Sequence, residues 1–171
     1  RKKKIEGSSE DFETFSRAIL NYKENNYKIK LRVKGDRVLH WYDKNQTSYK
    51  IDLRGDDRIW GMEEFSVQKP ITRNYTYEFI FHKLLQFNQL ISLKYFFINL
   101  SLNDNKQGIY AVEEGFSKEL IERNKKRNGP IFGVEESLGT EYPFVQYDLY
   151  SKKYWLDNYL NLTTDALAKL N

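Results

Sequence analysis

The stretch GMEEFSVQKPITRNYTYEFIFHKLL, residues 61–85, decides the fold, because it joins a strand to the clearest helix in the sequence. The apolar residues of Phe65 to Val67 predict a short strand, and Pro70 ends it because proline has no backbone N–H to donate. Thr72 is expected to cap a helix that runs to about Phe87. Helical spacing assigns the buried stripe of this helix to Tyr77, Phe81, Leu84 and Leu85.

Two alternating segments upstream predict a pair of antiparallel strands. YKIKLRV, Tyr27 to Val33, and SYKIDL, Ser48 to Leu53, place apolar side chains at every second position. A loop that holds Trp41 and Asp43 joins them. Further upstream, Ser8 to Glu24 is predicted to be a helix with a serine N-cap. The apolar positions that suggest this helix are Phe12, Phe15, Ile19 and Leu20.

Downstream of residue 85, the sequence predicts a hairpin and a second helix. Leu93 to Leu102 is apolar enough for a central strand, Asn103 to Gln107 reads as a polar turn, and Gly108 to Glu113 returns as the next strand. Ser117 is expected to cap the second helix, and Gly129 to end it. The expected last turn of this helix contains Lys125, Lys126 and Arg127.

The order strand, strand, short strand, helix, strand, strand, connector, helix predicts an α+β fold with a curled antiparallel sheet and one packed helix. This is also the layout of the smaller lobe (N-lobe) of protein kinases. Tyr147 to Leu162 is predicted to be partly helical, and Asp165 to begin a final short helix after a Thr163 or Thr164 cap. The expected division is an N-terminal helical extension (1–26), a kinase-like N-lobe (27–116) and the helix-led start of a second, helical lobe (117–171).

The composition is that of a globular protein, with 40% hydrophobic and 30% charged residues among 171. The net charge of +4 owes much to the run Arg1 to Lys4, for which a solvated chain end is a simpler explanation than nucleic-acid binding. No stretch reaches the ~18–20 continuous apolar residues of a membrane span. The absence of cysteine excludes disulfides and thiolate chemistry but leaves the compartment open.

A small set of charged residues fits the requirements of a nucleotide site. Lys34 and Gly35 lie at the tip of the first hairpin, where a backbone turn and a cation can meet phosphates. Lys50 lies on the returning strand, and Glu78 lies midway along the next helix. An acid in that position can pair with the strand lysine, as the strand–helix ion pair of kinases does. His82 follows Glu78 by four residues, so the two side chains are expected on one helix face.

Several common sites are excluded or disfavoured. The sequence lacks a G-x-x-x-x-G-K-[ST] loop, a G-x-G-x-x-G fingerprint and an H-R-D catalytic loop. With two histidines, His40 and His82, and no cysteine, a structural zinc site is not expected. No serine lies in a G-x-S-x-G elbow, which argues against a hydrolase of that type.

Four stretches in this order and spacing resemble the spore coat protein H (CotH) kinase-like family. They are KGDRVLHW, GMEEFSVQKPITRNYTYEFIFHKLL, INLSLNDNKQGIYAVEE and FSKELIERNKKRNGPIF. The resemblance spans roughly Lys28 to Glu136. Its most specific part is G-M-x-x-F-S-x-Q-x-P-x-x-R-N-Y-x-x-E, from Gly61 to Glu78, and its second anchor is GIYAVEE, from Gly108 to Glu114.

The resemblance implies an atypical kinase fold that binds ATP with a divalent metal, Mg²⁺, and phosphorylates an unidentified protein substrate. It implies a bacterial source, with a cell-envelope or secreted location. The residues it assigns to the nucleotide are Lys34 and Gly35 in the loop over the phosphates, Lys50, Glu78 on the regulatory-like helix that Arg73 and Asn74 begin, and Glu113 and Glu114 at the hinge beside adenine.

In that family the metal-holding carboxylates follow the hinge, and this sequence reaches Asp165 and ends at Asn171 without a matching motif. The residues are therefore expected to be catalytically silent on their own. The alternative hypothesis is a non-catalytic cell-surface or coat-associated binding module with the same fold, for which Tyr42, Tyr49 and Tyr142 would suit a recognition surface. The two hypotheses differ in whether ATP binds.

Overall fold

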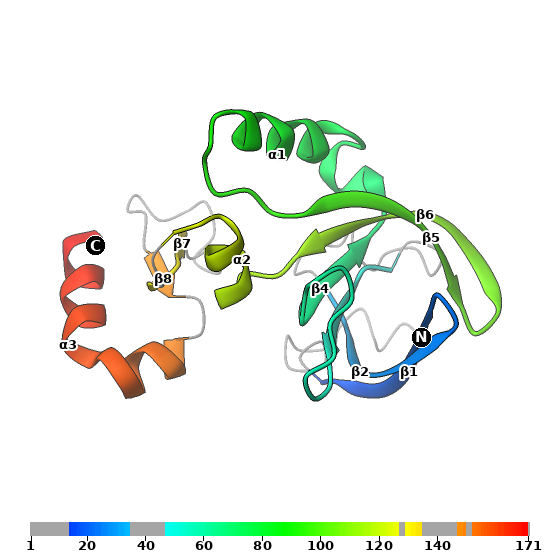
Figure 1. The fold of residues 1–171 in the computed structure, drawn as a ribbon, viewed down its shortest axis with the longest axis horizontal. Coiled ribbons are helices and arrows are strands. Elements are labelled where there is room, and N and C mark those ends of the chain that lie inside the picture. Colours follow the sequence, from blue (N-terminus) through cyan, green and yellow to red (C-terminus); the bar gives the residue numbers. More distant parts are fainter. Residues whose placement is uncertain (1–13, 35–46, 127–128, 135–146, 150–151, 171) are drawn as a thin grey trace, which may run out of the picture. The chain divides into compact units, whose positions relative to one another are not determined.

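A computed structural model describes residues 14–34, 47–126, 129–134, 147–149 and 152–170 of the chain. The described residues fall into two compact units, which divide between Lys125 and Lys126. The first unit is an α+β fold built on one curled antiparallel sheet (Figure 1). Among the described helices, none combines the length and apolar character that crossing a membrane would require.

The sheet of the first unit has six strands in the order β1-β2-β3-β4-β6-β5, and every neighbouring pair is antiparallel. The strands predicted near residues 27–33, 48–53 and 65–67 and the later hairpin are confirmed. The strand bounds are β1 Ser16–Tyr22, β2 Asn25–Val33, β3 Tyr49–Leu53, β4 Glu64–Gln68, β5 Tyr95–Leu102 and β6 Asn105–Glu114.

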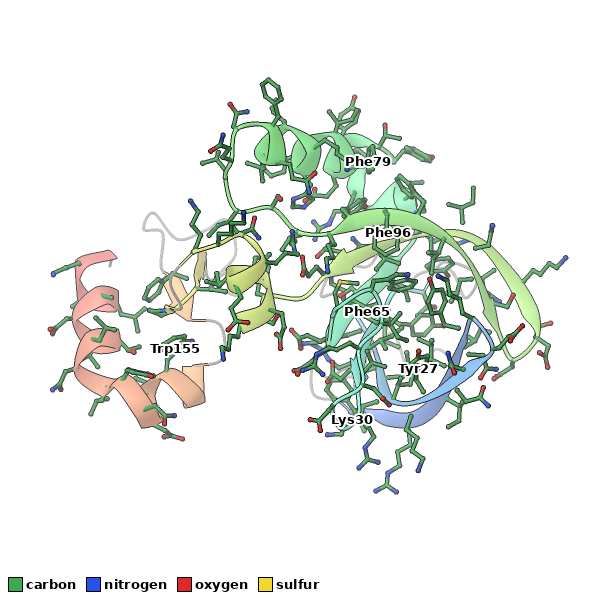
Figure 2. All side chains as sticks on the ribbon, in the orientation of Figure 1. Tyr27, Lys30, Phe65, Phe79, Phe96 and Trp155 are labelled. Carbon is green, nitrogen blue, oxygen red and sulfur yellow. The ribbon has the colours of Figure 1, made fainter. Side chains whose placement is uncertain are left out.

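The hydrophobic core lies inside the curl of the sheet. Successive strand residues point to opposite faces, and the register sets Ile51 opposite Phe65 and Val67 opposite Val112 on the inner one. The Trp60 ring packs against the Phe65 ring, with the two centroids 5.4 Å apart. Figure 2 shows Tyr27, Phe65 and Phe96 turned into the curl, whereas Lys30 points away from it. The buried core residues are Ile29, Ile51, Ile59, Met62, Phe65, Val67, Tyr110 and Val112.

The helix predicted over Ser8 to Glu24 is wrong where the structure describes it, because Ser16–Tyr22 forms strand β1. Lys23 and Glu24 both have positive φ, 47° and 65°, and this tight turn folds β1 back onto β2. Ile19 is 59% exposed on the outer face, so the apolar residues here alternate rather than forming a helical stripe. The earlier part of the predicted helix, and the loop with Trp41 and Asp43, lie outside the described residues.

The β5–β6 hairpin turns at Asn103 and Asp104, with φ of 48° and 62°, so β6 begins three residues before the predicted Gly108. The expectation that β5 is central is wrong, because β6 lies between β4 and β5 and leaves β5 at the edge. Helix α1 (Tyr77–Phe87) covers the outer face of β5, with the Phe79 and Phe97 rings 5.9 Å apart. On that outer face Tyr95 is buried, whereas Phe97 is 36% exposed, so the helix covers only the beginning of β5.

Helix α1 begins later than predicted, and Thr72 does not cap it. Residues Pro70–Arg73 form a short 3-10 helix, η4, in which Thr72 Oγ1 donates to the carbonyl of Lys69. Asn74 and Tyr75 then adopt positive φ, 50° and 61°, which separates η4 from α1. Thr76 takes the N-cap position without a side-chain hydrogen bond.

The predicted buried stripe of α1 is largely wrong. Tyr77, Phe81 and Leu84 are 70%, 51% and 57% exposed, and of the predicted four only Leu85 is half-buried. The face that meets the sheet instead carries Phe79 and the buried His82. Because β5 presents aromatic rings at this point, ring packing sets the rotation of the helix and turns its largest apolar side chains outward.

The second predicted helix, α2 (Lys118–Arg123), begins after Ser117 as expected but ends earlier. Asn124 is its C-cap and donates through Nδ2 to the carbonyl of Leu120, and Lys125 has a positive φ of 55°. The predicted basic last turn and the Gly129 cap are therefore wrong. Arg127 lies outside the described residues.

The second unit contains a two-stranded antiparallel sheet, β7 (Phe132–Val134) with β8 (Tyr147–Leu149), followed by α3 (Lys152–Leu170). Tyr159 has non-helical φ and ψ of −143° and 45°, so α3 is kinked there. The two helices predicted near the end of the sequence thus meet at Tyr159 rather than at a threonine cap. Thr163 is buried within α3.

Replacing Ile51 by alanine is expected to lower the free energy of unfolding by about 2–5 kcal/mol, because Ile51 is 3% exposed and its loss leaves a cavity. The matched change Ile19→Ala, on a strand but exposed, should cost less than about 1 kcal/mol. Urea unfolding followed by tryptophan fluorescence measures both. Equal losses would contradict a core placed inside the curl.

Candidate functional site

The outer face of the sheet carries a row of polar side chains that crosses four strands. The register sets Lys50 of β3 opposite Ser66 of β4, Ser66 opposite Glu113 of β6, and Glu113 opposite Tyr95 of β5. All four point away from the core because their sequence neighbours fill it. This set, Lys50, Ser66, Glu113 and Tyr95, is called the polar row below.

Glu113 is the centre of the site. Its Oε1 lies 3.0 Å from Lys34 Nζ at the end of β2, and its Oε2 accepts a hydrogen bond of 2.5 Å from Gln68 Nε2 on β4. Arg73 of η4 approaches the same carboxylate, with Nε 3.8 Å from Oε2. Three elements therefore converge on this one side chain of β6, which is 11% exposed.

The charge balance around Glu113 favours its ionised form. Burial raises the pKa of the Glu113 carboxyl, but the Lys34 ammonium, followed by Arg73 and Gln68, outweighs burial and holds the pKa below its ordinary value. Glu113 is thus an anion at neutral pH, and two cations share it. Lys34 and Arg73 thus outnumber the one carboxylate that both approach.

The predicted Lys50–Glu78 ion pair is not formed. Lys50 Nζ instead lies 2.9 Å from Glu64 Oε2 on the neighbouring strand β4, and Glu78 Oε1 lies 3.3 Å from His82 Nε2. The reason is the sheet order: α1 covers β5 at the edge, whereas Lys50 lies on β3 on the far side of β4 and β6.

His82 is held between α1 and β5. Its Nδ1 accepts a hydrogen bond of 3.2 Å from the backbone N–H of Leu93, so the neutral ring carries its proton on Nε2, facing Glu78. The ring stacks on Tyr95 at 5.8 Å. Burial lowers the pKa of His82, against the opposing effect of Glu78. Burial, and then the Glu113 charge, raises the pKa of Tyr95 to about 12.

Glu114 belongs to a different cluster from its neighbour Glu113. Its Oε2 accepts 2.7 Å from the backbone N–H of Lys94, and it pairs with Arg123 of α2. Arg123 also donates 2.7 Å to the carbonyl of Ser92. We call this set, Glu114, Arg123, Ser92 and Lys94, the α2 clamp, because it fastens α2 to the end of the sheet.

The structure brings together only part of the predicted nucleotide-facing set. Lys34 and Glu113 are in contact, Lys50 lies in the polar row, Glu78 is turned to His82, and Glu114 lies in the α2 clamp. Gly35 lies outside the described residues. Gln68 was not predicted to belong to the site, and it is a fully buried polar residue. The signal in the sequence is its position two residues after Ser66 on a short strand, because polar residues at every second position mark a polar face.

The described residues contain no group of three or more His, Cys, Asp or Glu side chains placed to hold a metal ion. The carboxylates near the site already have protein partners, Glu113 with Lys34 and Glu64 with Lys50. No residue of the described part of the chain is assigned as a magnesium ligand.

No protein-family model and no curated protein matches the chain. The resemblance to the CotH kinase-like family stays a prediction from the quoted motifs. What the molecule does has to be inferred from its own site.

Glu114→Gln is expected to lower the free energy of unfolding by about 3 kcal/mol, because it leaves Arg123 without its anion in a nearly buried pair. The matched change Glu122→Gln removes the exposed ion pair with Lys118 and should cost less than about 1 kcal/mol. Chemical unfolding of the two variants measures both losses in free energy. A Glu114→Gln cost no larger than that of Glu122→Gln would contradict the α2 clamp.

The stability of the first unit should fall as the pH drops below about 6.5, in part because of His82. Its folded-state pKa is lowered, so the unfolded chain binds the proton more readily, and the loss levels off below the folded value. His82→Gln should reduce the difference in unfolding free energy between pH 7.5 and pH 5.5. Lys83→Gln, on the exposed side of the same helix, should leave that difference unchanged.

Proposed function

We propose that the outer face of the sheet binds the phosphates of ATP, and that the first unit is the smaller lobe of a CotH-like protein kinase domain, which transfers a phosphoryl group to a protein. The observation that carries the proposal is the convergence of Lys34 and Arg73 on the single buried carboxylate of Glu113. Two fixed cations with one anion between them form a surface that attracts phosphate.

The order of elements supports this proposal. From β2 onward the chain runs strand, strand, strand, helix α1, strand, strand and helix α2, which is the layout expected of a smaller kinase lobe. The connection between β2 and β3 begins at Lys34, which corresponds in sequence to the loop that covers phosphates in kinases. A shared layout is an argument by analogy, so the charges at the site carry more weight.

The proposal gives the cations different positions from those of a typical kinase. There, a lysine on the third strand pairs with an acid on the helix. Here the third strand counted from β2 is β4, which carries Gln68 on the outer face, and the helix acid Glu78 faces His82. The proposed phosphate cations are therefore Lys34 and Arg73, and Glu113 takes the part of the acid that holds them.

Arg73 has capacity left for a ligand. Its side chain is 38% exposed, and its Nε is a buried donor without a hydrogen-bond partner among the described residues. Because this atom is buried beside Glu113, a phosphate would meet the exposed part of the guanidinium, which can donate charge-assisted hydrogen bonds. Magnesium, in this proposal, arrives with the nucleotide.

Titration calorimetry with ATP and Mg²⁺ tests the proposal. Wild type should release or absorb heat on binding, and Lys34→Gln and Arg73→Gln should each weaken the affinity about tenfold, because each removes a charge-assisted contact. The control is Lys28→Gln, an exposed lysine on the outer face of β2, which should bind as wild type does.

Absence of binding at millimolar ATP would overturn the proposal and favour the non-catalytic binding module. Equal affinity for tripolyphosphate and ATP would show that the adenosine is not recognised, and would also count against it. Circular dichroism of each variant verifies that lost binding is not lost folding.

A further inference from the structure

A concave site on the first unit is lined by residues other than those that contact Glu113. It has a volume of about 550 Å³ and lies between η4 with the turn after it and the beginning of β6. That volume is within the range of ligand pockets, about 300–1,000 Å³. The side chains used in the argument are Lys69, Pro70, Ile71, Tyr75, Lys106 and Ile109.

The apolar part of this pocket is open to solvent. Ile71, Tyr75 and Ile109 are 43%, 61% and 58% exposed, although they come from two separate elements and line one hollow. Single exposed apolar residues are ordinary, but several that gather in a concave surface mark a binding site.

The backbone turn after η4 helps to form the pocket. Tyr75 donates its N–H to the carbonyl of Pro70 at 2.7 Å and has a φ of 61°, a conformation that costs energy for a residue with a bulky side chain. This turn ends η4 and sets Tyr75 into the wall of the pocket. Strained backbone of this kind is concentrated at functional sites.

The charged side chains that line the pocket, Lys69 and Lys106, are both basic. Lys69 Nζ donates to the carbonyl of Gln107 and lies 4.5 Å from the centroid of the Tyr110 ring, which fixes the ammonium at the pocket wall. Lys106 is exposed, and no acidic residue belongs to the lining. An occupant that carries negative charge beside an apolar group therefore complements the site.

A second exposed apolar surface follows the pocket residues in the chain. Two residues after Tyr75, helix α1 begins, and its exposed stripe consists of Tyr77, Ile80, Phe81 and Leu84, which are 70%, 58%, 51% and 57% exposed. Their spacing of three and four residues places them on one face of the helix. A small acid would cover only the pocket, whereas a protein segment also covers this stripe.

We infer that the pocket receives an aromatic or aliphatic side chain from a segment of a partner protein, and that acidic residues next to that side chain meet Lys69 and Lys106. Further apolar residues of the same segment lie on the stripe of α1. This inference does not depend on ATP binding, because its residues are different from those around Glu113.

Fluorescence anisotropy of a labelled octapeptide tests the inference. The probe has a central Phe-Asp-Leu-Glu segment flanked by Gly and Ser. One comparison peptide replaces its acids by lysines, and another replaces its apolar residues by serines. The Phe-Asp-Leu-Glu probe should bind in the micromolar range, and both comparison peptides should bind at least about tenfold more weakly.

Two pairs of variants locate the site. Ile109→Asp should weaken binding about tenfold or more, whereas Ile19→Asp, on another strand and 59% exposed, should not. Lys106→Glu should weaken binding several-fold, with the difference shrinking at high salt, whereas Lys28→Glu should have no effect. If Ile109→Asp unfolds the protein, Tyr75→Ser tests the same pocket and should also weaken peptide binding.

The inference is overturned if the lysine-containing peptide binds as well as the acidic one, if no peptide binds at millimolar concentration, or if Ile19→Asp matches Ile109→Asp. Benzoate that displaces the peptide fully would show a small-molecule site instead. Saturating ATP with Mg²⁺ should leave peptide affinity unchanged, and full competition would place both ligands at one site and overturn the inference.

Discussion

The first unit depends on one buried carboxylate. Glu113 accepts contacts from Lys34, Gln68 and Arg73, and so links the ends of β2, β4 and η4 to β6. An ionised group of this kind is stable away from water only while its partners stay in place. The dependence is mutual, because the carboxylate in turn holds Lys34 and Arg73 in position. The arrangement that keeps the strand ends together is therefore the same one that fixes two cations on the outer face.

The rotation of α1 has an equally large effect on the surface. Phe79 and His82 pack on the rings of Phe97 and Tyr95, and this leaves the larger apolar stripe of the helix in solvent. One helix thus separates two surfaces of opposite character. Its inner side borders the polar row, where charge dominates, and its exposed side carries the apolar stripe of Tyr77, Ile80, Phe81 and Leu84. The proposed nucleotide site and the proposed peptide site both use η4, through Arg73 in the first and Ile71 in the second, but they share no side chain.

Much of the sheet was predictable from alternation, because strands such as β2 and β3 place one side chain in the core and the next in water. The errors arose where tertiary contacts decide. β1 looked helical because its turn, at Lys23 and Glu24, contains no glycine to signal a hairpin. The buried side of α1 is chosen by rings on β5, which the helix sequence does not contain. The Lys50–Glu78 pair required knowledge of strand order, and the role of Gln68 required knowledge of which face of β4 is polar.

The α2 clamp restricts the junction between β6 and α2. Glu114 was expected at the hinge beside adenine, yet it binds Arg123 and the backbone N–H of Lys94, and the N–H of Gly115 donates to the carbonyl of Glu64. A larger residue could not replace Gly115 unless Glu64 moved, because a Cβ at position 115 would lie 2.5 Å from the Glu64 side chain. Any displacement of α2 relative to the sheet therefore has to break the nearly buried pair of Glu114 and Arg123.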